Sequence, residues 1–223
     1  MKQQLFHLSI MLSGALFFAA CSDTPKGDQA TVTDQQQAAA PATGRTFMVD
    51  TTASSVRFTG NGVGKNHPGT FQLSNGTLAV SDSSITGGQF TINMASMQME
   101  QQEEMFQTKL KGHLQSADFF DVAKWGTAKF EITEVKPYTA AGGDSSVVAG
   151  ANHTVSGNFT MKDVTKNISF PAKIDVIGNA LTAQANFNID RTQWGIRYGN
   201  DKSLGDKFIS ETVNIQLNLT ATL

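Results

Sequence analysis

The sequence predicts an all-β domain, an extended antiparallel β-barrel of about eight strands with one helical insertion at about 101–122. In residues 213–223 every second residue is apolar. A strand turns successive side chains to opposite faces, so this segment has one dry face and one solvated face. Several long strands of this kind must stack as a sandwich or close into a barrel. The same alternation recurs in residues 181–189, 168–176, 155–161 and 90–94.

The first 20 residues have the composition of a signal peptide. Lys2 precedes an apolar run over residues 5–18, and Ala19 and Ala20 follow it. The run is too short for a stable membrane span. Cys21 resembles the cysteine of the lipobox in bacterial lipoproteins, which is acylated and becomes the mature N-terminus. We expect residues 1–20 to be a lipoprotein signal peptide and Cys21 the site of the lipid anchor; an ordinary secretory signal is the alternative.

A lipid anchor also predicts where the protein resides. We expect an exported, periplasm-facing lipoprotein that is held firmly to a bacterial membrane, because several acyl chains anchor a protein more strongly than one. Of the two bacterial membranes, the outer is the expected one. Cys21 is the only cysteine, so no intramolecular disulfide is expected. The formal net charge is -2 and there is no Lys/Arg run, so nucleic acid is not an expected partner.

Residues 21–45 are rich in Gln, Ala, Thr and Asp and carry no hydrophobic period. Such a composition cannot bury enough apolar surface to order itself. We interpret the segment as a flexible tether and place the folded domain at residues 46–223.

The domain begins with short predicted strands, and its patterning then changes. Asn75-Gly76 predicts a hairpin turn between two of those strands. Further along, Phe106, Leu110 and Leu114 are four residues apart, which is typical of a helix of about ten residues, and Gly112 predicts a break in it or its cap. Expected strands lie at 48–50, 55–60, 69–73, 76–80, 87–96 and 127–135. In the last of these Val135 falls out of phase, which predicts a bulge.

Three stretches carry a resemblance to one family. They are residues 112–122 (GHLQSADFFDV), 157–166 (GNFTMKDVTK) and 189–196 (IDRTQWGI). Together they resemble the YceI-like family of exported, lipocalin-like proteins, over roughly residues 46–223. The resemblance implies a barrel whose lumen holds a long polyisoprenoid tail, as of a quinone or prenyl phenol, and a helical insertion near one mouth. Trp125 departs from the family pattern, since a proline is common there, and many members carry a plain signal peptide.

Phenylalanines recur on the dry faces, and they bring large apolar area without a polar tip. A lumen lined by them favours a hydrocarbon tail, because each buried CH₂ contributes about 0.8 kcal/mol. Small residues such as Gly157 and Ala185 leave room for a channel; the alternative is that the same side chains pack as a dry core. The candidate ligand-binding residues are Phe58, Phe71, Phe90, Ile92, Met94, Phe119, Phe130, Ile132, Phe159, Met161, Phe170, Phe187, Ile189, Trp194, Val213, Ile215 and Leu217.

Two of these candidates have a second interpretation. Trp194, with Arg191 nearby, lies where a strand ends in a Gly-rich loop, so it either contacts a ligand head group or forms a structural corner that closes the barrel. Phe119 either covers the lumen or packs in the core.

Catalysis is not expected. His113, Asp118 and Asp121 form the one tight cluster of titratable groups, but neither Gly-x-Ser-x-Gly nor His-Glu-x-x-His occurs. The two aspartates are explained as capping and turn residues. We therefore expect no enzyme, no metal and no cofactor.

The sequence as a whole favours binding of a polyisoprenoid or related lipid, such as a prenyl quinone, for storage, shielding or transport. The expected partners are that lipid and the membrane that holds the anchor. The alternative is a stress-related periplasmic interaction module with a filled barrel and a protein partner, which the sequence does not identify.

Overall fold

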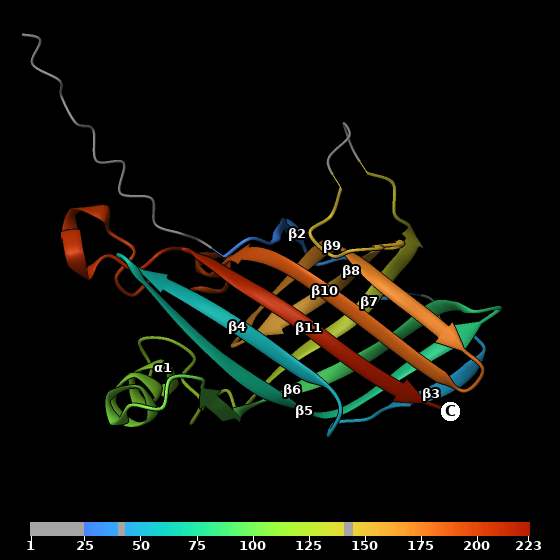
Figure 1. The fold of residues 1–223 in the computed structure, drawn as a ribbon, viewed down its shortest axis with the longest axis horizontal. Helices are drawn as coiled ribbons and strands as arrows, with labels where there is room; N and C mark the ends of the chain where they lie inside the picture. The colour runs from blue at the N-terminus through green and yellow to red at the C-terminus, as the bar shows by residue number, and fades with distance from the viewer. Residues whose placement is uncertain (1–24, 40–42, 141–144) are drawn as a thin grey trace, which may run out of the picture.

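The computed structural model describes residues 25–39, 43–140 and 145–223 (Figure 1). The predicted signal peptide and Cys21 lie outside the described residues. Among these residues no helix is both long and apolar enough to cross a membrane. The strands are β1 (Asp28–Gln29), β2 (Thr31–Asp34), β3 (Arg45–Val49), β4 (Ser55–Gly62), β5 (Lys65–Ser81), β6 (Ser84–Met99), β7 (Thr127–Pro137), β8 (His153–Met161), β9 (Val164–Ile177), β10 (Ala180–Asp190) and β11 (Thr212–Thr222).

The strands close into an antiparallel barrel, as the alternating pattern predicts. From β5 to β11 each strand pairs with the next along the chain. β3 and β4 occupy one position in succession, because both pair with β11 on one side and β5 on the other. The barrel therefore has eight positions, and the predicted fold class is confirmed.

The prediction of a hairpin turn at Asn75-Gly76 is wrong, because both residues lie inside the continuous strand β5. A Cβ on Gly76 would lie 2.7 Å from Val49 Cγ2 and 2.9 Å from Phe90 Cβ. The glycine therefore allows close packing inside a continuous strand. The actual turn lies between β5 and β6, where Asp82 and Ser83 take positive φ angles of 48° and 64°.

The bulge predicted near Val135 is confirmed. The pairing of β7 with β8 shifts by one residue between Ile132 and Glu134, which moves Val135 onto the face that Ile132 occupies.

The helical insertion is confirmed as η1 (Met105–Leu110), a π-helix, followed directly by α1 (Lys111–Gln115). Gly112 is neither a break nor a cap, because it lies inside α1, whose C-cap is Ser116. A Cβ on Gly112 would contact nothing within 4 Å. Short 3-10 helices η2 (Arg191–Trp194) and η3 (Lys202–Lys207) lie between β10 and β11. The insertion and η3 lie at the same end of the barrel, on the left in Figure 1.

The prediction that residues 21–45 are a flexible tether is wrong for residues 28–34. β9 and β10 pair only over residues 172–177 and 180–185 and diverge beyond them. β1 pairs with β10 at Phe187 and Asn188, and β2 pairs with β9 over residues 166–169. The segment thus fills the gap between the two strands. Composition did not reveal this, because the backbone edges of β9 and β10 provide the hydrogen bonds.

Aromatic rings fill the end of the barrel away from α1. Phe170 and Phe187 stack with centroids 4.0 Å apart, and Phe130 lies 5.9 Å from Phe170. A Cβ on Gly157 would lie only 2.3 Å from the Phe130 ring. Small residues here accommodate large rings, and the hollows found in this half, among the residues that the structure describes, measure only about 50 and 30 Å³.

A candidate ligand cavity at the barrel mouth

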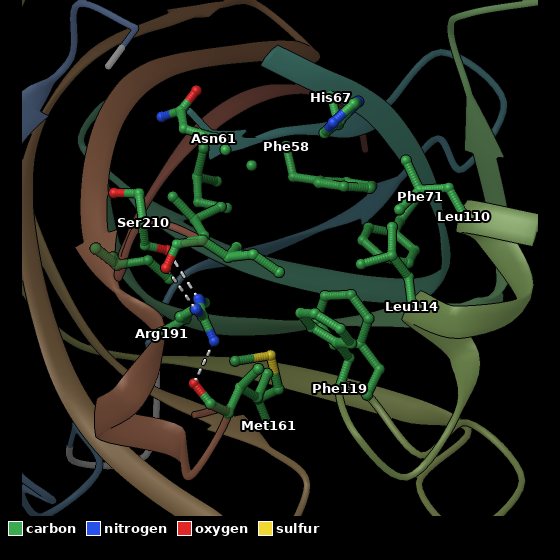
Figure 2. A pocket seen from close by; sticks show the side chains of 18 of the residues that line it. Phe58, Asn61, His67, Phe71, Leu110, Leu114, Phe119, Met161, Arg191 and Ser210 are labelled. Atoms are coloured by element: carbon green, nitrogen blue, oxygen red, sulfur yellow. Dashed lines mark hydrogen bonds between the residues drawn. The ribbon is translucent and has the colours of Figure 1, made fainter. Parts of the chain in front are cut away.

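The main cavity lies at one mouth of the barrel, between the barrel wall and the helical insertion. Its volume is about 420 Å³. Strands β4, β5, β6, β7, β8, β10 and β11 all contribute residues to its wall. The insertion covers it through Leu110, Leu114 and Phe119. Figure 2 shows Phe58, Phe71 and Phe119 projecting into the same space. The volume falls within the range of about 300–1,000 Å³ that is typical of small-molecule sites.

The structure divides the candidate residues into three groups. Trp194 is not among the residues that line the three cavities found in the described part of the chain. The candidates on the wall of the main cavity are Phe58, Phe71, Ile92, Met94, Phe119, Phe159, Met161, Ile189, Val213 and Ile215. Two hollows of about 50 and 30 Å³ lie deeper in the barrel, and some residues of the main cavity wall also border them. The remaining candidates line these hollows: Phe90, Phe130, Ile132, Phe170, Phe187 and Leu217.

Arg191 fixes the corner between β10 and η2. Its guanidinium is buried and donates to the carbonyls of Ser210 (2.9 Å), Ile196 (2.7 Å), Tyr198 (2.9 Å) and Ile209 (3.0 Å). Burial lowers the pKa of Arg191, but arginine stays protonated in proteins. Four of its five N–H groups are thus committed to the loop, so Arg191 shapes the mouth instead of offering a free cation to a ligand.

Trp194 is fully buried, and its Nε1 donates to the Phe159 carbonyl at 3.0 Å. Its ring packs edge-on against Phe159, with centroids 5.4 Å apart. Because Phe159 lines the cavity, Trp194 supports the cavity wall from behind.

Several lining residues were not among the candidates. Leu110 and Leu114 reach the cavity from the insertion, and their four-residue spacing marked an apolar helix face. Phe208 and Ile209 come from the irregular segment before β11, where no periodic signal marks them. They line the cavity only because the loop folds back, with the Ile209 amide donating to the Gly199 carbonyl at 2.7 Å.

The wall also contains uncharged polar side chains, among them Asn61 and His67. Asn61 is 2% exposed, and within the described part of the chain neither its Oδ1 nor its Nδ2 has a hydrogen-bond partner. His67 packs on Phe106, and its Nδ1 lies 3.4 Å from Gln101 Nε2. Burial, and secondarily Lys65, lowers the pKa of His67 below its ordinary value of 6.5. His67 is therefore neutral at pH 7 and able to donate or accept one hydrogen bond.

The remaining titratable cluster is a pair. His113 Nε2 lies 2.9 Å from Asp118 Oδ2, outside the cavity wall. Over residues 25–39, 43–140 and 145–223, no group of three or more His, Cys, Asp or Glu side chains is arranged to hold a metal ion.

Comparison with known proteins identifies the fold and family. The family model of the YceI-like domain matches residues 47–221. The chain belongs to the YceI-like family. A UPF0312 protein of Pseudomonas paraeruginosa is 43% identical over 67 residues, 30% of this chain and 29% of that relative. A UPF0312 protein of Serratia proteamaculans is 37% identical over 89 residues, 40% and 38% of the two chains. The matched segments thus span less than half the length of these relatives.

Two solved structures share the barrel fold. Burkholderia cenocepacia BcnA matches with a TM-score of 0.61 and 19% identity, over 78% of this chain and 99% of its own. A polyisoprenoid binding domain from Saccharophagus degradans, implicated in plant cell wall breakdown, matches with a TM-score of 0.57 and 16% identity, over 79% and 97%. At these identities the likeness concerns the fold.

Proposed function

We propose that this YceI-like protein binds an isoprenoid lipid in the cavity at its barrel mouth. The observation that carries the proposal is the cavity itself, about 420 Å³ and walled mainly by Phe, Leu, Ile, Val and Met side chains. A polar metabolite would lose its hydration there with few hydrogen bonds in return, whereas a hydrocarbon tail gains about 0.8 kcal/mol for each buried CH₂. The polyisoprenoid binding domain of the same fold supports this ligand class.

The cavity volume limits the tail that fits without rearrangement. At about 30 Å³ for each water-sized group, the cavity has room for roughly 14 such groups, a CH₂ or CH₃ being of comparable size. That is close to three five-carbon isoprene units. A longer tail has to displace the stacked rings of Phe170 and Phe187 below it, so we propose that about three units bind in the cavity and that longer tails gain little more.

Asn61 and His67 are the groups proposed to receive the polar end of the ligand. An unpaired buried amide is costly and is satisfied by a partner that both donates and accepts. A hydroxyl does both, and neutral His67 accommodates it equally. A prenyl alcohol, phenol or quinol therefore fits this wall better than a pure hydrocarbon.

The cellular role follows from the N-terminus. We propose that Cys21 is acylated and holds the protein to a bacterial membrane, facing the periplasm, preferably at the outer membrane. There it would store, shield or carry its lipid without catalysis. The His113–Asp118 pair supplies no nucleophile and lies outside the cavity wall.

A thermal-shift series tests the proposal. The chain from Ser22 onward is titrated with farnesol, with its saturated hydrocarbon analogue, and with prenyl alcohols of increasing length. A ligand at 100 times its Kd stabilises the native state by about 2.7 kcal/mol, which raises Tm by about 5–10 °C for a chain of this size. We expect this rise with farnesol and a smaller one with the hydrocarbon. No rise with any prenyl compound refutes the proposal and favours the interaction-module alternative.

A further inference from the structure

The N-terminal segment is attached at the cavity end of the barrel. Asn188 Nδ2 donates to the carbonyls of Pro25 (3.4 Å) and Gly27 (3.3 Å), and the Ala30 amide donates to the Asn188 carbonyl at 3.1 Å. The residue after Asn188 in β10 is Ile189, which lines the cavity. The chain that leads from the predicted anchor therefore meets the barrel beside the mouth.

The attachment continues along the whole segment. Ala30 is 5% exposed within the gap between β9 and β10. Asp34 pairs with Lys166 at 2.9 Å, and Gln36 exchanges two backbone hydrogen bonds with the Asn158 side chain, at 3.0 and 2.8 Å. Residues 25–36 are thus part of the barrel wall and do not act as a free spacer.

The length of chain before Pro25 sets the distance to the membrane. Three residues lie between Cys21 and Pro25, so four Cα–Cα steps join the two. At a maximum of about 3.6 Å per residue, they reach about 14 Å. If the chain were free from Cys21 as far as Arg45, its maximum length would be about six times as great. With the acylated Cys21 of the proposed function, we propose that the barrel rests with its mouth against the lipid surface, so that the cavity opens toward the bilayer.

The surface at the mouth fits a lipid partner. Four large apolar side chains are exposed there: Val63 (46%), Met105 (54%), Tyr198 (47%) and Leu204 (43%). They come from four segments: the β4–β5 turn, η1, the loop after η2, and η3. The opposite end also exposes apolar side chains, with Met48 at 57%, Ile177 at 78% and Leu223 at 53%. Exposure alone therefore does not choose between the ends; the position of Pro25 does.

Charge contributes little to this contact. Lys65, Lys202 and Lys207 lie at the mouth, but Asp201 and Asp206 lie in the same loop as two of them. The apolar side chains carry the contact, so a neutral phosphatidylcholine surface is sufficient. A lipid can then pass from the bilayer into the cavity without exposing its tail to water.

Fluorescence quenching tests the orientation on the full acylated protein. Acylation of Cys21 leaves an engineered cysteine as the single free thiol, so Leu204→Cys at the mouth and Ile177→Cys at the far end each take one fluorophore. Both proteins are bound to phosphatidylcholine vesicles that contain a nitroxide-labelled lipid. We expect the label at position 204 to lose most of its emission and the label at position 177 to lose little.

Vesicle flotation separates the two possible failures. A protein that does not float refutes the anchor of the proposed function, and the orientation with it. A protein that floats, but whose label at 204 is quenched no more than the label at 177, refutes the orientation alone. Ala30→Asp supplies a second check, because a charge in the gap should detach residues 25–36; flotation should persist while quenching at 204 falls.

Discussion

Gly60 offers a way to fill the cavity without disturbing the fold. It lies in β4 two residues after Phe58, on the same face, and lines the cavity. A Cβ on Gly60 would meet nothing within 4 Å, and its φ angle is not in the positive range that requires glycine. Gly60→Phe should therefore place a ring in the space that the lipid occupies.

The expected effect on binding is large. A ring that displaces one isoprene unit removes five buried carbons, which at about 0.8 kcal/mol each is about 4 kcal/mol, or roughly 10³-fold in Kd. Stability should be unchanged or rise by about 0.4–1 kcal/mol, because replacing glycine reduces the conformational entropy of the unfolded chain.

The assay is farnesol titration with Tm as a second readout. The matched control is Gly112→Phe, which makes the same change at a glycine with equally open surroundings outside the cavity wall. If Gly60→Phe folds normally and binds farnesol as tightly as the control, the cavity is not the ligand site.

Three further predictions follow from the wall of the cavity. Asn61→Leu should stabilise the empty protein by about 1–3 kcal/mol, because it removes an unpaired buried amide, and should weaken farnesol more than its hydrocarbon analogue; a lower Tm would contradict this. Arg191→Lys should destabilise the protein by about 3–5 kcal/mol in urea unfolding, since one ammonium cannot replace four carbonyl contacts, and an unchanged midpoint would show that the corner depends on other residues. The lowered pKa of His67 means that the unfolded chain takes up a proton at a higher pH than the native state. Stability should therefore be greatest above pH 6.5 and fall as the pH drops below 6.5, and His67→Gln should reduce that slope; an identical slope in the variant would refute the role of His67.

The fold was predictable because a strand of a one-layer barrel has an unavoidable sequence signature. Residues 213–223 alternate strictly, because one face of β11 lies inside the barrel and the other carries polar side chains, of which Asn218 and Thr222 are exposed and Asn214 is buried. The bulge at Ile132 and Glu134 was visible for the same reason, since a one-residue slip moves Val135 to the other face.

The docked N-terminal segment was not predictable from composition. Its sequence offers only Ala30 and Val32 as apolar contacts. Its backbone pairs with edges that β9 and β10 leave open, and this opening depends on how far apart the two strands diverge, which no local pattern records.

The candidate site was predictable as a set of dry-face residues but not as a cavity. Alternation places Phe58 and Phe170 equally inside the barrel. Both rings lie over a glycine, since a Cβ on Gly157 would come within 2.3 Å of the Phe130 ring and a Cβ on Gly69 within 2.6 Å of the Phe58 ring. The difference lies further along β4, where a Cβ on the cavity-lining Gly60 would meet nothing within 4 Å. No alternation pattern reports that open space.

The central claim is that this cavity holds an isoprenoid lipid, and native mass spectrometry of the acylated protein, purified gently from its own membranes, tests it most directly. The account predicts one additional mass for each chain, released on denaturation and identified as a prenyl compound with a hydroxylated or quinone head group. A protein that is consistently free of any such mass, and that remains so after incubation with prenyl alcohols, would contradict it.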